Sequence, residues 1–301
     1  MEKVFVLGAS GFVGRRLVSR LVERGFAVRA GSRSPGSPAR GVESARCDLE
    51  SRRSIESALD GCGAAIFLVH GLNREGDYPA WERAGALRFC RAARDRGVRR
   101  VVYLGGLSPA GEASRHLKSR LAVGEILRQA GIGCVELRAS LLIGEGGASW
   151  KIARDLALRL PRLPLTPFSL ARTEPLDVDD AIAAIVASLD PALAAPAIFD
   201  LPGPATLTVA DFLALIARRA GRHLARFEAP RLTVELAALG ARLLCGSDFS
   251  LTRELLLGLS HDVVAVDHSG WRALGHSRLV GLEESVDRAL AATQVARNGL
   301  T

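Results

Sequence analysis

The sequence has 301 residues, of which 48% are hydrophobic, enough to bury a sizeable core in one large α/β domain or in a nucleotide domain with a smaller attachment. This composition excludes a disordered chain. The net charge of +8 would suit nucleic acid, but the arginines are scattered through every expected helix and are not clustered with aromatic residues. We therefore expect no nucleic-acid partner, and expect most arginines to lie on solvated helix faces.

The cysteines exclude two further classes of protein. Their number is odd and they are widely spaced without a CxxC pair, which argues against a disulfide framework and against a zinc site. The N-terminal residues run straight into an apolar strand, so no signal peptide is expected, and no stretch reaches the ~18 uncharged apolar residues that span a bilayer. We expect a soluble, cytoplasmic protein with no bound metal. Its thiols are expected to be buried and reduced: Cys47, Cys62, Cys90, Cys134 and Cys245.

The first fourteen residues, MEKVFVLGASGFVG, place an apolar run directly before three glycines, and a helical pattern follows. This order of strand, glycine turn and helix points the unpaired N–H groups of the helix at whatever lies above the turn, which suits a pyrophosphate. Gly8 permits the tight turn, Gly11 lets the backbone approach phosphate, and Gly14 lets the helix pack against the strand. The alternative is a structural turn that binds nothing. We predict dinucleotide contacts from Gly8, Ser10, Gly11, Phe12, Val13 and Gly14.

Strand-like and helix-like segments alternate up to about residue 145. Strands are expected near 3–7, 26–32, 43–47, 64–70, 99–105 and 133–138, and helices near 12–24, 51–60, 79–96 and 115–130. Gly25, Gly97 and Gly131 each follow a helix and precede the next strand, which is a common use of glycine. Such alternation predicts a parallel sheet with helices on both faces.

The pattern changes after Gly144. Apolar helical stretches and a proline-rich segment at 161–167 come first, and further helices are expected at 179–189, 209–220, 231–245, 250–258 and 280–292. We expect this part of the chain, residues 146–301, to form a smaller, mainly helical cap on a nucleotide-binding domain of residues 1–145.

The end of the second strand bears on cofactor choice. An acidic residue there would bind the adenosine ribose of NAD, but the strand ends in Ser32 and Arg33. Arg33, together with Arg15 after the glycine turn, would attract a 2′-phosphate and favours NADP over NAD. The alternative for Arg33 is an ordinary exposed loop residue. After the third strand, Asp48 and Leu49 fit a contact with the adenine edge, and the alternative for Asp48 is the N-cap of the next helix.

In these motifs and in their order, the sequence resembles the short-chain dehydrogenase/reductase superfamily, in its extended, epimerase-like and atypical branches. The matching segments come in the family's order and cover almost the whole chain: GASGFVG, CDLES, AAIFLVHGL, GVRRVVYLGGLSP, HLKSRLAVGEILR, VELRASLLIGEGG, EPLDVDDAIAAI and FDLPGPATLTVADFLALIA. Within the superfamily it is most similar to NmrA-like proteins and to the NADPH-binding accessory subunit of respiratory complex I.

The resemblance implies a Rossmann-type, doubly wound parallel sheet with a helical C-terminal cap. Segments of about 173–201 would return from the cap to the Rossmann core. Residues 104–107 and 69–72 would line the cofactor groove, and the latter range includes Val69, His70 and Gly71.

The catalytic residues of the active enzymes of this superfamily are replaced here. The family's serine or threonine after the fifth strand reads Gly106, and its Tyr-x-x-x-Lys pair reads His116 and Arg120. The spacing puts both side chains on one helix face. Arginine can hold a ribose hydroxyl but does not lose its proton, so only His116, with an ordinary imidazole pKa of about 6.5, could act as an acid or base. The alternative is that His116 is a polar helix-start residue and Arg120 only neutralises cofactor charge.

Several other polar residues are assigned structural roles. We expect Tyr103 to pack inside a strand, Lys118 to point away from the face of His116 and Arg120, and Asp179 and Asp180 to stabilise a helix N-terminus. Between residues 231 and 259, apolar and cationic residues recur at helical spacing. These patches fit the core of the cap or, alternatively, an apolar substrate pocket or a peripheral membrane contact.

Two functions follow from these observations. In the first, the chain is an NADPH-dependent oxidoreductase for a small apolar carbonyl or quinone-like compound. In the second, it is a non-catalytic NADP(H)-binding sensor or an assembly or structural protein. Loss of the usual serine, tyrosine and lysine favours the second, whereas the retained His116 and Arg120 pair keeps the first open. The sequence leaves the substrate and the oligomeric state open.

Overall fold

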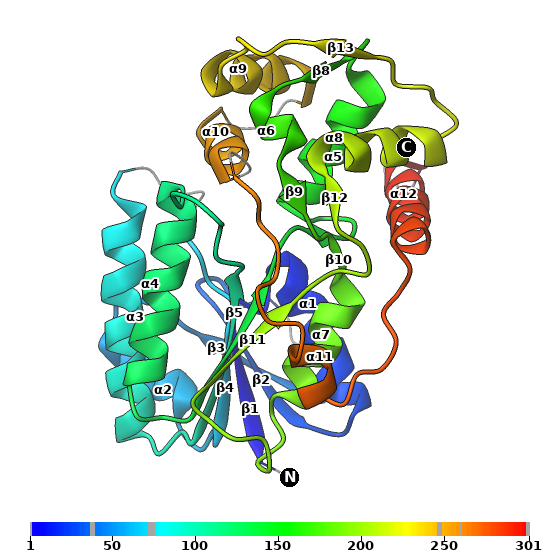
Figure 1. The fold of residues 1–301 in the computed structure, drawn as a ribbon. Helices are drawn as coiled ribbons and strands as arrows, with labels where there is room; N and C mark the ends of the chain where they lie inside the picture. Colours follow the sequence, from blue (N-terminus) through cyan, green and yellow to red (C-terminus); the bar gives the residue numbers. More distant parts are fainter. Residues whose placement is uncertain (1, 37–39, 72–75, 246–248, 259–260, 299–301) are drawn as a thin grey trace.

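The computed structural model describes residues 2–36, 40–71, 76–245, 249–258 and 261–298. Within these residues, parallel strands form a seven-stranded central sheet (Figure 1). In spatial order the strands are β11 (Ala197–Leu201), β6 (Cys134–Ala139), β5 (Arg100–Gly106), β4 (Ala64–Phe67), β1 (Lys3–Leu7), β2 (Ala27–Ser32) and β3 (Val42–Arg46). Because the strand order reverses next to β1, the sheet is doubly wound, and the predicted fold class is confirmed.

Helices cover both faces of the sheet (Figure 1). Alternate residues of β1 supply the two cores: Val4 and Val6 face one side, whereas Phe5 and Leu7 face the other. The first side is covered by α1 (Phe12–Glu23) and α7 (Val178–Ala187). The second side is covered by α2 (Arg52–Leu59), α3 (Tyr78–Asp95) and α4 (Arg115–Gln129).

Three predicted helix ends have the backbone that only glycine adopts without strain. Gly25, Gly97 and Gly131 have φ angles of 81°, 71° and 69° and follow α1, α3 and α4. Each glycine turns the chain directly toward the next strand. These ends confirm that glycine closes the helices before the strands.

The remaining elements lie beyond the carboxyl end of the sheet, toward the top of Figure 1, or run along its side. They are β7 (Leu142–Ile143), α5 (Ala148–Arg159), β8 (Leu163–Leu165), α6 (Pro167–Leu170), β9 (Arg172–Thr173), β10 (Leu176–Asp177), β12 (Leu207–Thr208), α8 (Val209–Arg219), β13 (Arg226–Glu228), α9 (Val234–Cys245), α10 (Phe249–Gly258), α11 (Gly270–Ala273) and α12 (Leu282–Asn298). Many share a separate core that contains Trp150, Phe212, Ile216 and Val286. This core gives the cap its own packed interior.

The C-terminal segment crosses back over the sheet. Trp271 of α11 packs in the same core as Val4. Asp180 of α7 accepts hydrogen bonds from the backbone N–H of Val280 (2.9 Å) and contacts His276 Nε2 (3.1 Å). Burial raises the pKa of Asp180. This carboxylate therefore fastens the segment that precedes α12.

The acidic residues at the start of α7 have structural partners. Asp177 is the N-cap, since its side chain accepts from the backbone N–H of Asp179, and Asp177 also accepts from Ser285 Oγ (2.6 Å). Asp179 pairs with Arg288 of α12 at 2.5 Å. Asp179 and Asp180 therefore lie in the first turn of α7, as predicted, and both also bind the C-terminal segment.

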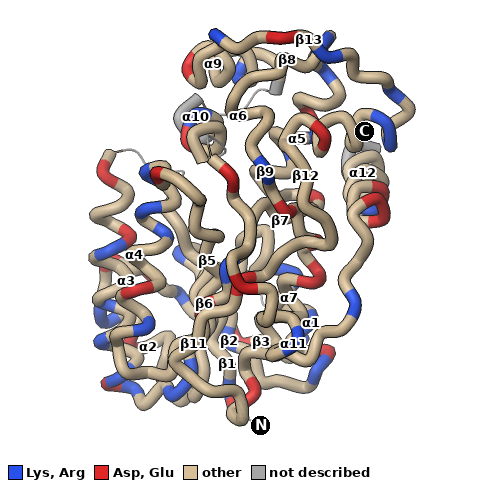
Figure 2. The backbone as a smooth tube through the Cα atoms, in the orientation of Figure 1, with Lys and Arg blue, Asp and Glu red and all other residues tan. Residues whose placement is uncertain are grey.

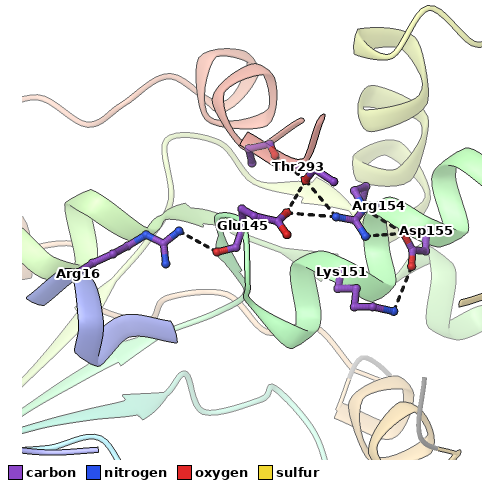
Figure 3. Close-up of polar contacts among 7 residues, drawn as sticks. Arg16, Glu145, Lys151, Arg154, Asp155 and Thr293 are labelled. Atoms are coloured by element: carbon purple, nitrogen blue, oxygen red, sulfur yellow. Dashed lines mark hydrogen bonds and ion pairs between the residues drawn. The ribbon is translucent and has the colours of Figure 1, made fainter. Parts of the chain in front are cut away.

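A buried polar network joins the first helix to the cap (Figure 3). Arg16 of α1 donates to the carbonyl oxygen of Glu145 (2.7 Å), and the Glu145 carboxylate pairs with Arg154 of α5 at 3.2 Å. Arg154 is itself buried, pairs with Asp155 at 2.7 Å, and donates to Thr293 Oγ1 of α12 (3.0 Å). Buried charges persist only when they are paired, and this pairing holds α1, α5 and α12 together.

Basic and acidic residues are mixed on the surface, and several of them form ion pairs. Figure 2 shows basic and acidic residues interspersed along α3 and α4, and ion pairs there include Arg52 with Asp95 (2.7 Å) and Arg115 with Asp77 (2.9 Å). This distribution is consistent with solvated helix faces. Among the helices that the structure describes, none combines the length and the apolar character needed to traverse a bilayer. The buried, free cysteines are Cys47, Cys62, Cys90 and Cys134, whereas the side chain of Cys245 lies outside the described residues.

Candidate functional site

A cavity of about 820 Å³ lies between the carboxyl end of the sheet and the cap. Its wall combines the glycine turn, the ends of the central strands, the start of α4 and the inner surface of the cap. Ligands of doubly wound sheets bind at this edge. The cavity brings together eight of the residues predicted from the sequence: Gly8, Gly11, Phe12, Val13, Gly14, His70, His116 and Arg120.

The glycine turn has the geometry of an anion cradle. Gly8 has a φ of +89°, a region that residues with side chains rarely adopt. A Cβ on Gly14 would lie 2.8 Å from the Ala9 Cα and closer still to the Gly8 carbonyl oxygen, so the turn packs directly on the helix. Gly11 is the N-cap of α1, and no side chain within the described residues caps this helix. Its first-turn N–H groups are therefore available to a pyrophosphate, so this chain's residues fit a dinucleotide.

Leu104, Gly105 and Gly106 of the predicted groove segment 104–107 also line the cavity, whereas the other predicted cofactor contacts are not among the described residues of its wall. Arg33 is exposed directly after β2, and Arg15 is exposed and donates to the carbonyl oxygen of Ser10 (2.7 Å). Both guanidinium groups are thus open to solvent. The residues outside the cavity wall are Ser10, Arg15, Ser32, Arg33, Asp48, Leu49, Val69 and Gly71.

The alternative role of Asp48 as a helix cap is wrong. The N-cap of α2 is Ser51, whose side chain accepts from the Ser54 N–H. Asp48 Oδ1 instead accepts from the backbone N–H of Glu50 (2.9 Å). Leu49 is buried in the core beside α3, because a leucine that follows a strand on the helix-covered face packs inward. Asp48 remains a predicted adenine contact.

His116 and Arg120 lie on one face of α4, and both line the cavity. Arg120 donates to the carbonyl oxygen of Leu104, and its guanidinium carbon lies 5.7 Å from the centre of the Tyr103 ring. Tyr103 is buried and donates from its hydroxyl to the Arg120 carbonyl oxygen (3.0 Å), so it packs as predicted. Lys118 points away and pairs with Glu112 at 2.6 Å.

The electrostatics of His116 differ from the expectation. Burial, and then the positive charge of Arg120, lower the pKa of His116 to about 3. The ordinary imidazole value expected from the sequence is therefore wrong for the protein without ligand, because sequence spacing carries no information on desolvation. His116 is neutral at pH 7, and its buried Nδ1 has no hydrogen-bond partner among the described residues. An unpartnered buried nitrogen on a cavity wall is available to a ligand.

Four further polar residues line the cavity and were not predicted, one of which is Ser149 of α5. Ser140 Oγ and Thr173 Oγ1 lie 2.6 Å apart on its wall. Glu254 of α10 is 8% exposed and accepts from the Tyr78 hydroxyl (3.3 Å) and from the His116 backbone N–H (3.3 Å). Ser140 directly follows β6, so its place at the carboxyl edge of the sheet was a usable signal. Glu254 lies within a leucine-rich helix far along the chain, and nothing in the sequence links it to α4.

Comparisons with known proteins agree with this architecture. The family model for an NAD(P)H-binding domain matches residues 8–152. Dihydroflavonol 4-reductase from Dianthus caryophyllus is 30% identical over 119 residues, which cover 34% of this chain and 33% of that protein. The chain thus aligns with about a third of the length of this curated relative.

Two solved structures share the fold over nearly the whole chain. UDP-glucose 4-epimerase from Thermotoga maritima, with UDP-glucose, superposes with a TM-score of 0.75 at 14% identity and covers 98% of this chain and 99% of its own. MoeE5 in complex with UDP-glucuronic acid and NAD gives a TM-score of 0.75 at 16% identity, with the same coverage of both chains. From the matched family model, the doubly wound sheet and the glycine cradle, we conclude that residues 8–152 belong to a Rossmann-type NAD(P)H-binding domain.

Proposed function

We propose that the protein is an NADPH-dependent oxidoreductase that reduces an apolar carbonyl or quinone-like compound. The observation that carries this proposal is the single cavity, which joins the glycine cradle, the His116 and Arg120 pair and the apolar inner surface of the cap. A substrate held by the cap would therefore lie next to a cofactor held by the cradle. The name of the matched plant relative, a reductase, supports the same class of reaction.

The two parts of the chain would divide the work. Residues 1–145 would bind the cofactor and residues 146–301 would shape the substrate site, with segments of about 173–201 returning to the Rossmann core as α7 and β11. When bound, the reduced nicotinamide supplies a hydride. Arg120 is placed to balance cofactor charge, and Ser140 and Thr173 offer hydroxyl groups to a substrate oxygen.

The preference for NADP over NAD rests on Arg33 and Arg15. Arg33 is exposed at the carboxyl end of β2, where an acidic residue would repel a 2′-phosphate. Arg15 is exposed in the first turn of α1. Neither guanidinium has a carboxylate partner among the ion pairs of the described residues. Both are therefore open to an anionic ligand.

Proton delivery would come from His116 or from water beside it. An imidazole with a pKa of about 3 is neutral at pH 7 and is a weak acid through its N–H. A bound dinucleotide brings negative charge into the cavity, and negative charge raises the pKa of a nearby imidazole. We propose that cofactor binding raises the pKa of His116 toward neutral pH, where the imidazole can donate a proton.

The test is NADPH oxidation with a panel of aldehydes, ketones and quinones. We expect turnover with an apolar carbonyl, and we expect His116→Ala to lower kcat by a factor on the order of 10² to 10⁴ without changing NADPH affinity. Lys118→Ala is the matched control, since Lys118 lies on the same helix and points away from the cavity. Turnover that is unaffected by His116→Ala would remove His116 from proton transfer.

One observation favours the alternative of a non-catalytic NADP(H)-binding sensor or assembly protein. Gly106 stands where the active enzymes resembled by this sequence carry a hydroxyl, and a Cβ there would already lie 3.1 Å from Leu117. A serine at this position would therefore require the tip of the Leu117 side chain to move by a few tenths of an ångström. NADPH binding with no turnover across the panel would support this alternative.

Three finer predictions stay predictions. They are the placement near NmrA-like proteins and the complex I accessory subunit, the cytoplasmic location, and the peripheral membrane contact. The contact would involve α9, where Leu239 and Leu243 are 47% and 80% exposed. Exposed leucines at helical spacing suit a lipid surface.

A further inference from the structure

The cavity is polar at one end and apolar at the other, and this asymmetry carries information about the substrate. We infer that the substrate is an elongated carbonyl compound with a long hydrocarbon tail, its head beside Ser140 and Thr173 and its tail between α5 and α9. This inference deepens the proposed reduction and rests on it for the identity of the head group. The tail site itself is argued from the cavity alone.

The polar side chains gather at the sheet end. Ser140, Thr173, His116 and Arg120 lie at the ends of strands or on the first turns of α4. Glu254 comes from the cap but reaches the same end, because it accepts from the His116 N–H at 3.3 Å. A carbonyl oxygen would find its hydrogen-bond donors here.

The opposite wall is hydrocarbon. It comes from α5, β8, α6, α8, α9 and α10 and from the segment before α9, with these side chains: Ile152, Ala153, Leu156, Leu160, Leu163, Pro164, Phe168, Val209, Phe212, Leu213, Leu232, Leu236, Ala237, Ala241, Leu244, Leu255 and Leu256. Within the described part of this wall, Glu254 is the one charged side chain that the cap contributes. Apart from Ser149 of α5 and Glu254, such a lining offers no polar side chain to a sugar or a phosphate, and it rewards burial of methylene groups.

The contrast with the solved neighbours supports this choice. Two of them are described with UDP-glucose or UDP-glucuronic acid, which are ligands rich in hydroxyl and phosphate groups. A buried polar ligand needs a polar partner for most of its donors and acceptors. Among its described residues, the leucine-rich cap side of the cavity offers only the side chains of Ser149 and Glu254 as such partners. We therefore assign the cap end to a hydrocarbon tail.

The lining also continues to the surface. Leu236 of α9 lines the cavity and is 58% exposed, so it stands at the mouth. Leu239 and Leu243 follow it at helical spacing on the exposed side of α9. A long tail that exceeds the cavity can therefore remain in contact with apolar side chains at this mouth.

Gly240 provides the test. It lines the cavity, and a Cβ built on it would meet no described atom within 4 Å. Gly240→Phe would therefore fill the tail site without pushing on the backbone, and Gly240→Ala is the control of minimal size. The probes are methyl n-alkyl ketones of increasing length, titrated by calorimetry into protein with and without NADPH.

With the parent protein, each added methylene is expected to tighten binding about fourfold, corresponding to about 0.8 kcal/mol, until the tail site is full. Gly240→Phe should stop this rise at a shorter chain while NADPH affinity stays unchanged, and Gly240→Ala should keep it. Affinity that is independent of chain length, or a rise that Gly240→Phe leaves intact, would overturn the inference.

A second pair of variants guards against a folding defect in Gly240→Phe. Leu236→Asp puts a charge at the mouth and should weaken only the longest ketones, whereas Val295→Asp adds the same charge at an exposed residue of α12 that lies outside the cavity wall. Equal effects of the two changes would argue against entry at α9. Ketone binding that depends on chain length, without turnover, would reject the proposed reduction but support the tail site. Turnover of the ketones without any dependence on chain length would support the proposed reduction but reject the tail site.

Discussion

Replacing Gly14 is expected to damage the fold, whereas replacing Gly11 is expected to damage ligand binding. A Cβ on Gly14 would lie 2.8 Å and 2.9 Å from the Ala9 Cα and carbonyl carbon, and closer still to the Gly8 oxygen. These are backbone atoms, so relief requires the whole turn to move away from α1. Overpacking of this kind costs about 1 to 3 kcal/mol, and we expect Gly14→Ala to lose at least that much free energy of unfolding.

Gly11 is less constrained in the free protein. Its φ of −75° suits any residue, and a Cβ would lie 3.2 Å from the Gly8 oxygen as its one near neighbour. We expect Gly11→Ala to cost less than about 1 kcal/mol of stability, as is usual for such a change at an N-cap. The added methyl would stand where a phosphate approaches the helix N–H groups. We expect NADPH affinity to fall at least tenfold, which is about 1.4 kcal/mol.

Urea denaturation and calorimetric titration with NADPH separate the two effects. Gly281→Ala is the control, because Gly281 is exposed and its added Cβ would meet no described atom within 4 Å. The reasoning fails if Gly14→Ala is as stable as the control, since the turn would then not pack on α1 as described. It also fails if Gly11→Ala binds NADPH as the parent does.

Two further changes test the charges of Arg33 and His116. Arg33→Asp should weaken NADPH binding more than NADH binding. Arg24→Asp makes an equal charge change at the far end of α1 and should affect the binding of both cofactors alike. Equal losses of NADPH and NADH affinity in Arg33→Asp would count against a contact with the 2′-phosphate. The folded-state pKa of His116 of about 3 lies below the ordinary value, so the unfolded chain binds more protons and stability falls as the pH drops below about 6.5. Between about pH 7.5 and pH 5, His116 should lower the free energy of unfolding of the parent protein by up to about 2 kcal/mol. The His116→Gln variant lacks this group, so its free energy of unfolding should fall by about 2 kcal/mol less than that of the parent over the same range. A parent and variant with parallel pH profiles would show that His116 is not desolvated.

The periodicity of the sequence predicted the sheet because the residues that favour strands locally are also the residues that pack in the two cores. Val4 to Leu7 alternate between the two cores, and the glycines after α1, α3 and α4 adopt left-handed backbone as expected. The fourth strand was predicted to reach residue 70 but ends at Phe67. The chain leaves the sheet at that point to open the cavity edge, and apolar character alone does not mark where a strand leaves its neighbours.

The site was harder to predict than the fold. The glycine turn and the His116 and Arg120 pair are local patterns, so their shared cavity could be anticipated. The pKa of His116 and the contact of Glu254 depend on packing between α4 and α10, which lie more than a hundred residues apart in the chain. Sequence spacing within one helix carries no trace of such contacts.

The return of the C-terminal segment to the sheet has a consequence for the order in which the protein folds. Val4 and Val6 belong to a core that is completed by α7 and by Trp271 and Leu274. During synthesis, α1 covers part of this face early, but the face is covered completely only after α7 and then Trp271 and Leu274 have been made. An apolar sheet face that is only partly covered during synthesis is prone to wrong association, so the amino-terminal half depends on the residues of α7 and α11 for protection from such association as well as for its stability.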